Sequence, residues 1–523
     1  MRLIFATAFA LFAASPPAHA ALTCQQALDL PEAEESADEA VEAGSTFGNR
    51  ISEIDGATIS SPALLKAALA KAGNKTPLIN GGDFGGWDFA KLDFSVANTC
   101  FYTSKMKASR WNGGKYDGLG LIDADLEGAT FVGSQMDHVL MRQANLLNVS
   151  MAGARLRKGL FDGGWSGSAE NWNLTGADMR GFVFACGITV GDSCTYDRNG
   201  MTFAQADLTD ADISTFSLWN DGAYRGTKLA NTRIAPAQIA EVQGAAIAAP
   251  VLLVGGDDNV SLTADELGEL QRQYEINQLA LREPSFPCAK AMTKVEQLIC
   301  GEYMDEVRRS DRHMAALYAM IRPKTPSVAR SQSKWLASRN ACSEHECLRQ
   351  RYEARITELQ AMLDEPEILK PGEAALFIGH PIDFPTTFHS DALFRKITPI
   401  LVTAAMSETV LIRDKDGSYR IEGEAIGGNA HLCSVGGEKL QYEAKSGWFT
   451  GPSDEAATGR AAVFRWFDDR IEFPGNGHPD ENFPGSAEYA SCGMRAILSP
   501  MTRIAVSPAL LAKRRAYFET DER

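Results

Sequence analysis

The sequence predicts a multidomain protein: a solenoid, then a small disulfide-framed α-helical bundle, then a small antiparallel β domain. Three observations support this. Large apolar residues recur at every fifth position from Phe101 to Phe161. Cysteine-framed amphipathic helical patterns fill residues 285–365, and alternating apolar and polar residues across residues 366–523 indicate strands. A chain of 523 residues is too long for a single core, so several domains are expected.

Residues 1–20 have the pattern of a secretory signal peptide. One arginine precedes a short apolar run, which ends in the small-x-small sequence Ala18-His19-Ala20. The pattern predicts cleavage near Ala20 and a periplasmic or secreted protein. An N-terminal membrane anchor is the alternative, but the run is shorter than a membrane span requires. No later segment of the sequence predicts a membrane span.

The composition limits the partners and the cofactors. A net charge of −16 leaves no basic footprint for nucleic acid, so no nucleic-acid partner is expected. Zinc needs four clustered ligands, and the nearest group, Cys342, His345 and Cys347, has no obvious fourth partner. We therefore expect no metal and no cofactor.

The ten cysteines are an even number, which in an exported chain predicts disulfides. Short sequence separations favour local pairs, one further pair belongs to the C-terminal domain, and one is left by elimination. The predicted pairs are Cys186–Cys194, Cys288–Cys300, Cys342–Cys347, Cys433–Cys492 and Cys24–Cys100.

Residues 21–78 are predicted to form an N-terminal helical cap segment. Ser61 can cap a short helix, Pro62 suits its first turn, and Gly73 can end it. Leu64, Leu65, Ala68 and Leu69 are expected to form its apolar face. The open end of a solenoid must be covered, so this helix is expected near the first coil.

The five-residue period fits neither a helix, which repeats at 3.6, nor a strand, which repeats at 2. A fixed short period over such a length indicates a solenoid. If five residues form one side of a square, four sides form a coil with one large side chain per side pointing inward. A small residue mostly stands two positions before each large one, as the narrow interior requires.

The segments "ADLEGATF", "ANLLNVSM" and "ADLTDADI" resemble the pentapeptide-repeat family. The resemblance implies a right-handed quadrilateral β-helix over residues 79–236, with loops leaving it at residues 162–171 and 185–200. The best-known members of that family imitate DNA and bind gyrase, a role that export would prevent here. A rigid spacer or binding surface is the expected role.

Residues 237–284 are expected to be a linker and a helix that begins at the capping box Thr263-x-x-Glu266. Residues 285–365 then show a second capping box, Thr293-x-x-Glu296, and three longer helical patterns. In two of these, large side chains share one face: Val307, Met314, Leu317, Tyr318 and Ile321 in the first, and Leu348, Tyr352, Ile356 and Leu359 in the last. A bundle this small commonly needs disulfides.

The cysteine-framed module resembles the LprI-type lysozyme inhibitor family. The resemblance runs from Cys288 through Thr293, Val295 and Glu296 to Cys300, and then through Gln332, Trp335, Arg339, Cys342, Cys347, Tyr352 and Arg355. It implies a secreted domain that inhibits lysozyme.

The candidate partner-binding residues of this module are Glu344, His345 and Glu346, because an acidic loop would attract a basic lysozyme. Trp335 and Arg339 are further candidates. Their spacing of four on one helix face also fits a structural role, in which the arginine stacks on the indole.

Residues 366–523 are predicted to form an antiparallel sheet or barrel. The segment "SYRIEGEA" alternates apolar and polar residues, and Cys433 and Cys492 are expected to bridge two strands. His431 is read as a strand residue. Asp468 and Asp469 are read as a turn, with a catalytic pair as the alternative if they line a cleft.

Together these features predict an exported, non-enzymatic binding or scaffold protein of the bacterial periplasm, with lysozyme inhibition as its most specific candidate activity. A protein partner is expected, either lysozyme or another cell-wall hydrolase. The alternative is an enzyme that acts on peptidoglycan or another glycan through an unrecognised site in the C-terminal domain. Two carboxylates about 5 to 9.5 Å apart in a cleft would favour that alternative.

Overall fold

The computed structural model describes residues 23–25, 50–163, 168–185, 189–190, 193–194, 199–216, 218, 222–256, 258–426, 432–467, 469–474, 483, 485–492 and 498–519. The chain divides into two units. The first contains residues 1–188, 194–233 and 241–250, and the second contains residues 189–193, 234–240 and 251–523. Each unit is described by itself.

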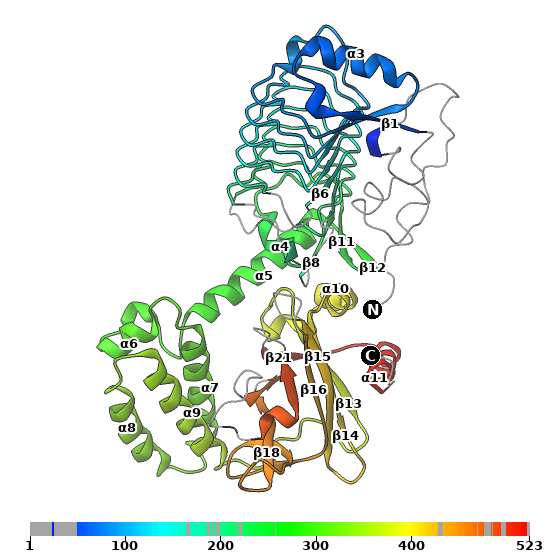
Figure 1. Ribbon diagram of the computed structural model, residues 1–523. Coiled ribbons are helices and arrows are strands. Elements are labelled where there is room, and N and C mark those ends of the chain that lie inside the picture. The colour runs from blue at the N-terminus through cyan, green and yellow to red at the C-terminus, as the bar shows by residue number, and fades with distance from the viewer. Residues whose placement is uncertain are drawn as a thin grey trace. The chain divides into compact units, whose positions relative to one another are not determined.

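The first unit is a β-helix of stacked coils (Figure 1). Its seven-stranded sheet runs in sequence order, and every neighbouring pair is parallel. Equivalent positions in successive coils follow the register Phe101, Leu121, Met141 and Phe161. The strands are β1 (Ile51–Asp55), β2 (Thr76–Asn80), β3 (Cys100–Tyr102), β4 (Gly120–Ile122), β5 (Leu140–Arg142), β6 (Leu160–Asp162) and β7 (Val183–Ala185).

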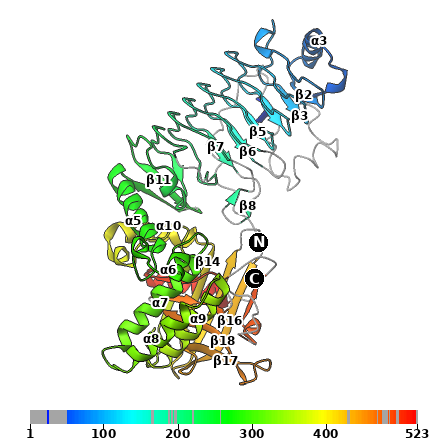
Figure 2. The ribbon, with the colours of Figure 1, turned by 90° about the vertical axis from the view of Figure 1, so that its left-hand side faces the viewer.

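The remaining sides of each coil pair through isolated parallel bridges, such as Lys105↔Asp125 and Arg110↔Thr130. Figure 2 shows the strands of the main sheet stacked along one face of the coils. Each step of the register equals four sides of five, so the square coil predicted from the sequence is confirmed. The bridges Ser150↔Asn173 and Asn173↔Thr202 take longer steps, so the ladder resumes after both predicted loops.

The interior of the β-helix is filled by the periodic residues. All thirteen predicted positions from Phe101 to Phe161 are at most 4% exposed. Phe89, Trp111 and Phe131 stack as a column, with ring centroids 3.7 and 5.3 Å apart. A Cβ added at Gly114 would lie 2.0 Å from the Tyr116 hydroxyl, so a small residue is needed beside this large one.

The N-terminal end contains more strand than the sequence predicted. Strands β1 and β2 pair in parallel and are joined through the 3-10 helix η2 (Gly56–Thr58) and the helix α3 (Pro62–Ala72). The parallel sheet therefore begins at Ile51, inside the segment for which only a helical cap was expected. Ser61 caps α3 as predicted, with its side chain accepting from the amide of Leu64.

One expected position on the apolar face of α3 is wrong. Leu64 is 47% exposed, whereas Leu65 is fully buried and Ala72 is also buried. The packed face therefore follows the spacing i, i+3, i+4 and i+7 from Leu65, and Leu64 lies one residue outside it.

The disulfide Cys24–Cys100 is present and fixes the N-terminal segment to the β-helix. Cys24 lies over β4, where a Cβ added at Gly120 would approach its Sγ to 2.1 Å. The next two coils have Leu140 and Leu160 in this register. Among the described strands of this sheet, only β4, which receives the disulfide, has a glycine there.

The C-terminal part of the repeat continues through the bridge Lys228↔Ala246. Further short elements are η3 (Phe89–Lys91), β8 (Thr189–Val190), β9 (Ser193–Cys194), β10 (Arg233–Ile234) and α4 (Gln238–Glu241). Strands β8 and β9 pair with each other. Cys186 lies outside the described residues, so the predicted Cys186–Cys194 disulfide does too.

The longest continuous part of the second unit, residues 251–523, begins with the antiparallel hairpin of β11 (Val251–Gly255) and β12 (Asp258–Leu262). The helix α5 (Ala264–Arg282) follows. It starts at the predicted capping box, in which the side chains of Thr263 and Glu266 each accept from the other residue's amide.

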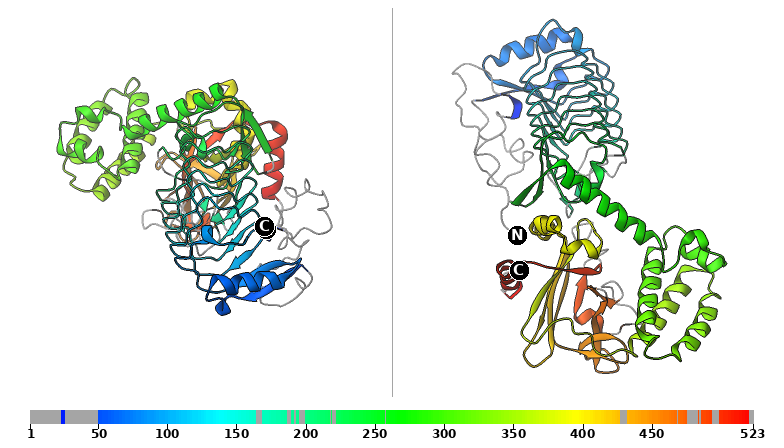
Figure 3. Two further views of the ribbon diagram at one scale, coloured as in Figure 1. Left: turned by 90° about the horizontal axis from the view of Figure 1, so that it is seen from above. Right: turned by 180° about the vertical axis from the view of Figure 1, so that it is seen from behind.

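Next comes the helical module, whose helices are shown in green in Figure 3. Its elements are η4 (Cys288–Lys290), α6 (Lys294–Ile299), α7 (Asp305–Ile321), α8 (Val328–Arg339) and α9 (His345–Gln360). The predicted disulfides Cys288–Cys300 and Cys342–Cys347 are present. The predicted faces of α7 and α9 form the core, except that Tyr318 is only partly buried.

The C-terminal region forms a closed antiparallel barrel, which was one of the two predicted forms. Eight strands pair in the order β15-β14-β13-β21-β19-β18-β17-β16, and β16 closes the ring on β15. They are β13 (Ala374–Gly379), β14 (Ser407–Arg413), β15 (Tyr419–Ile426), β16 (Leu432–Glu443), β17 (Trp448–Pro452), β18 (Arg460–Phe467), β19 (Arg470–Glu472) and β21 (Met501–Ile504). A ninth strand, β20 (Ala490–Cys492), pairs with β16, where the predicted Cys433–Cys492 disulfide joins directly paired residues.

The prediction that residues 366–523 consist of strands is wrong for two helices, α10 (Ala392–Thr403) and α11 (Pro508–Glu519). Asp391 caps α10, and its buried Phe394, Ile397 and Leu401 have helical spacing. This helix was not predicted from the sequence because Pro399 lies inside the pattern. Two 3-10 helices, η5 (Thr386–Ser390) and η7 (Ser486–Glu488), complete the domain.

Candidate binding sites in the helical module and the adjoining cleft

The residues that carry the resemblance to the LprI-type family mostly face the interior of the helical module. Arg355 is 1% exposed and donates from Nε to the side-chain oxygen of Gln332 at 2.9 Å. The Tyr352 hydroxyl donates to Asp311 at 2.6 Å and accepts from Arg339 at 3.3 Å. Burial, followed by the charge of Asp311, raises the pKa of Tyr352 far above its usual range. This network joins α7, α8 and α9.

Arg339, a candidate for partner binding, is buried in the helical module. It is 4% exposed, and its guanidinium is enclosed by the module's own side chains. It lies 5.8 Å from the ring of Trp335, as the four-residue spacing suggested. Trp335 is half-buried, and its indole N–H donates to the backbone oxygen of Arg351 at 3.0 Å. These contacts support a structural role for Trp335 and Arg339.

The acidic segment at Glu344–Glu346 is partly helical, whereas the sequence suggested a loop. Glu344 is the exposed N-cap of α9, which begins at His345. Glu346 pairs with Arg349 at 2.8 Å, and this hydrogen bond is the main reason that its pKa falls to about 2. His345 Nε2 lies 3.8 Å from a carboxylate oxygen of Glu306. Glu306, Glu344, His345 and Glu346 together form what we call the acidic edge.

The helical module and the barrel meet at a partly buried ion triplet. Arg465 of β18 is 7% exposed and binds Glu353 of α9 at 2.8 Å and Glu472 of β19 at 2.7 Å. Although burial alone would raise the pKa of Glu472, the charge of Arg465 holds it at about 2. Beside the triplet, His313 of α7 stacks on Phe467 with ring centroids 3.5 Å apart.

The two carboxylates of this triplet share one arginine, so their evident role is to hold the two domains together. Of the aspartates read as a turn, Asp469 lies between β18 and β19 with a φ of 60°, as in a tight hairpin turn. Asp468 and His431 lie outside the described residues.

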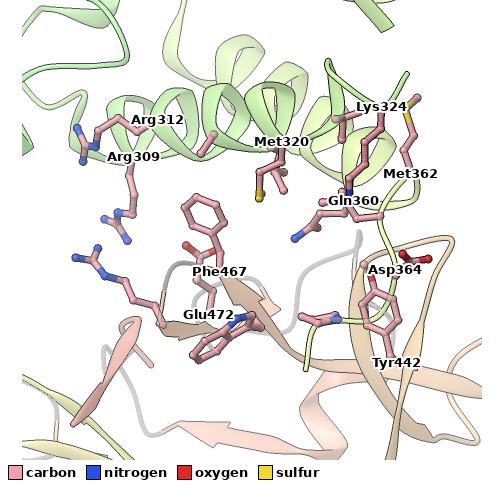
Figure 4. A pocket seen from close by; sticks show the side chains of 18 of the residues that line it. Arg309, Arg312, Met320, Lys324, Gln360, Met362, Asp364, Tyr442, Phe467 and Glu472 are labelled. Carbon is pink, nitrogen blue, oxygen red and sulfur yellow. The ribbon is translucent and has the colours of Figure 1, made fainter. Parts of the chain in front are cut away.

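A cavity of about 720 Å³ lies between α7 and the barrel strands (Figure 4). Figure 4 shows Arg309 and Met320 extending from the helix and Phe467 facing them from the strand side. Arg312, Lys324, Gln360 and Arg470 also line the cavity. Two smaller hollows, of about 540 and 230 Å³, share Arg309 with it.

Sequence reasoning missed these cavity residues. A signal was present, because Arg308, Arg309 and Arg312 place several positive charges on one helix of an acidic chain. Arg470 is distant in sequence, and only the pairing of β18 with β19 brings it to the same cavity. In the part of the chain that the structure describes, no group of three or more metal-ligating side chains is found.

The comparisons with known proteins concern the repeat. Residues 121–157 match the family model for pentapeptide repeats, in eight copies. The match falls within residues 101–161, where the five-residue period is unbroken. None of the curated proteins matches the sequence.

Three solved structures are similar to part of this chain. A pentapeptide repeat protein from the thylakoid lumen of Arabidopsis thaliana is 24% identical, with a TM-score of 0.15; the match covers 19% of this chain and 63% of that chain, less than two thirds of its length. HetL from Nostoc sp. strain PCC 7120 is 16% identical, with a TM-score of 0.14, over 36% of this chain and 91% of that one. QnrB1, a plasmid-mediated fluoroquinolone resistance protein, is 13% identical, with a TM-score of 0.13, over 39% and 99%. At these values the family model alone carries the assignment of the repeat.

Among the described residues, no helix has both the length and the apolar character that crossing a membrane requires.

Proposed function

We propose that this chain is an exported, non-enzymatic binding or scaffold protein of the bacterial periplasm. The observation that carries the proposal is the distribution of its disulfides. One fixes the N-terminal segment to the β-helix, two frame the helical module, and one joins two strands at the barrel. Disulfides persist in oxidising compartments such as the periplasm, which agrees with the signal-peptide pattern of residues 1–20.

The packing of the β-helix supports a binding role on its outer surface. Its interior is occupied by large side chains, with serines such as Ser104 and Ser134 hydrogen-bonded to backbone oxygens in the remaining space. A filled solenoid has no room for a ligand inside, so any partner would contact the outer sides of the coils. Repeat proteins commonly use extended surfaces of this kind.

Lysozyme inhibition by the helical module is the more specific proposal. The acidic edge supports it, because Glu306, Glu344 and Glu346 gather around His345 beside the Cys342–Cys347 disulfide. Glu344 is the best contact residue, since Arg349 already pairs with Glu346. An acidic surface would steer the association of a basic lysozyme.

The test uses the purified, oxidised full-length chain after removal of the signal peptide. The chain should slow lysis of cell-wall suspensions by at least one lysozyme class at micromolar concentration, and added salt should weaken the inhibition. The variant Glu344→Lys, alone and with Glu346→Lys, should lower the association rate several-fold. The control with the same change of charge is Glu367→Lys with Glu438→Lys, at exposed positions elsewhere, and it should inhibit like the wild type.

Two results would decide against this proposal. If the folded chain leaves every lysozyme class uninhibited, the resemblance to the inhibitor family has no functional counterpart here. If the chain alone clears a peptidoglycan suspension, the alternative of a glycan-cleaving enzyme is correct. Export is checked separately by fractionating cells and measuring the mature N-terminus, which should begin near Ala21.

A further inference from the structure

One end of the large cavity gathers three arginines. Arg309 and Arg312 lie on neighbouring turns of α7, and Arg470 begins β19. The pKa of Arg312 is lowered from its usual value, mainly by burial and then by the positive charges of Arg309 and Arg470. The three guanidinium groups are therefore close enough to repel one another.

The protein supplies little to neutralise this charge. Arg312 Nη1 donates to the backbone oxygens of Leu281 and Glu283 at 3.0 and 2.5 Å, which fixes its position. Asp311 offsets its charge in part, against the positive charges of Arg309 and Arg470. Within the described residues, the guanidinium groups of Arg309 and Arg470 have neither an ion pair nor a hydrogen bond. The Nε atom of Arg470 is buried without a partner.

The nearby carboxyls do not fill this role. Glu472 is bound by Arg465. Asp383 lines the neighbouring hollow of about 540 Å³, and among the described ion pairs within 4.0 Å none joins it to an arginine. Uncompensated cations in a partly buried site are costly, and an anion bound there would remove that cost.

Apolar side chains form part of the remaining wall of the cavity, which also includes Lys324, Gln360 and Asp364. Leu317, Ile321 and Phe467 line its wall. At its edge, Met320 is 49% exposed and Met362 is 44% exposed, and both are flexible side chains that adapt to apolar groups. A volume of about 720 Å³ lies within the range typical of small-molecule sites and is much larger than a simple inorganic anion needs.

Gln360, at the end of α9, adds a polar group without a partner. The residue is 5% exposed, and its side-chain oxygen is buried without a hydrogen bond. In Figure 4 its amide extends into the cavity from the side opposite Arg309. An amide can donate or accept, so it can bind a polar atom in the middle of a ligand.

From this arrangement we propose that the cavity binds a small amphipathic anion, with a carboxylate or phosphate head group between Arg309, Arg312 and Arg470 and an apolar body along Leu317, Ile321 and Phe467. This site is independent of the acidic edge and of lysozyme inhibition. Arginine suits such a head group because its planar N–H groups can donate in pairs to carboxylate or phosphate oxygens.

The experiment is calorimetric titration of the oxidised full-length chain with four probes, the two amphipathic anions being kept below their micelle-forming concentrations. Dodecanoate and dodecyl phosphate carry both parts of the proposed ligand and distinguish a carboxylate from a phosphate head group. Dodecanol carries only the apolar body, and inorganic phosphate carries only the charge. At least one of the first two should bind at a single site at least about tenfold more tightly than either partial probe.

Matched variants locate the site. Arg309→Gln should weaken binding of the preferred probe by about tenfold or more, because one charge-assisted hydrogen bond is lost. Arg330→Gln, at an exposed position of α8 outside the cavity, should leave binding within about twofold of wild type. Ala316→Trp places a large side chain in the cavity without changing charge, and it should also weaken binding. Circular dichroism confirms that each variant is folded.

Several outcomes would overturn the proposal. Absence of saturable binding by both amphipathic anions would remove the site. Equal affinity for dodecanol would show that the arginines play no part, and equal affinity for inorganic phosphate would show that the apolar wall plays none. If folded Arg309→Gln and Ala316→Trp both bind like the wild type, the ligand occupies another place.

Discussion

Positive charges are paired with carboxylates on the outside of the β-helix, whereas among the described residues of the cavity beside α7 two arginines are unpaired. On the outer faces of the coils, cations meet carboxylates one coil away, as in Lys107–Glu127 at 2.6 Å and Arg233–Asp212 at 2.8 Å. In the cleft, Arg309 and Arg470 have no such partner in the described part of the chain. In a repeat, every residue has a fixed neighbour one coil away, so charges can be matched by register. The unmatched charges occur where two domains meet, and that is where a ligand is expected.

The most severe test of the repeat is a charge in its filled interior. Phe131→Asp would bury an unpaired carboxylate at a position that is 0% exposed. The free energy of unfolding of this unit should fall by about 5 kcal/mol or more, which would unfold it. Thermal melting followed by circular dichroism measures the change.

The neighbouring residue provides the control. Val132 is 44% exposed, so Val132→Asp should leave the melting temperature almost unchanged. If both variants melt like the wild type, the inward register from Phe101 to Phe161 is wrong.

The next largest effect concerns Gly120, the position that receives Cys24. Gly120→Leu restores the residue type of the next two coils but places a side chain where the Cys24 Sγ lies. The Cys24–Cys100 disulfide should not form, at a cost of about 2 to 5 kcal/mol. Counting free thiols in the denatured protein measures the loss.

A comparison with Cys24→Ser shows whether the loss of stability in Gly120→Leu comes from the missing disulfide or from the leucine itself. The two single variants and their combination should have similar stabilities, because each removes the same cross-link. A fully oxidised Gly120→Leu protein would contradict this account of the glycine.

His313 should make the stability of the second unit depend on pH. Burial first, then the charge of Arg465, lowers the pKa of His313 from 6.5 to about 3. Between these values the unfolded chain binds a proton that the folded chain does not, so stability falls as pH drops from 6.5 towards 3. At pH 4.5 this loss is about 3 kcal/mol relative to pH 7.

Denaturant unfolding at pH 7 and pH 4.5 tests this effect. His313→Phe keeps a ring against Phe467 and should remove the part of the difference that His313 contributes. His380, whose pKa burial also lowers to about 3, should still contribute its own part. His345→Phe, at the half-exposed acidic edge, should retain the wild-type difference. An identical pH dependence in all three proteins would rule out His313 as the cause.

The smallest expected effect concerns the exposed ion pairs of the repeat. Lys107 lies 2.6 Å from Glu127 and 3.4 Å from Asp125, but its side chain is 56% exposed. Lys107→Gln should therefore lower the melting temperature only slightly, and the change should shrink further in high salt. A loss as large as that of the Cys24→Ser variant, or one insensitive to salt, would show that the matched charges of the coils stabilise more than surface pairs usually do.

Features that depend on residues close together in the sequence were predicted correctly, and most features that depend on distant residues were not. The interior of the repeat was predictable because one large residue recurs per side, and the capping boxes at Thr263 and Thr293 were predictable because each spans a single helical turn. Strand β1 was missed because its partner β2 follows only after α3. Helix α10 was missed because Pro399 interrupts its pattern.

The candidate sites show the same limit. Glu344, His345 and Glu346 could be selected from the sequence because they are consecutive, but the pairing of Glu346 with Arg349 was not considered. Arg339 was proposed as a possible contact, and only the structure places it at 4% exposure against Tyr352. The cavity could not be predicted at all, because Arg309 and Arg470 are far apart in sequence and approach only when the module packs on the barrel.

The constant size of the coil makes the length of the β-helix adjustable. Leu121 and Met141 occupy equivalent places in successive coils, so deleting residues 121–140 would join Gly120 to Met141 without shifting any later residue to another side. The deletion would shorten the β-helix by one layer, about 4.8 Å. Gene duplications or losses that span a whole coil could therefore lengthen or shorten this protein in complete layers while the residues at both ends keep their surroundings.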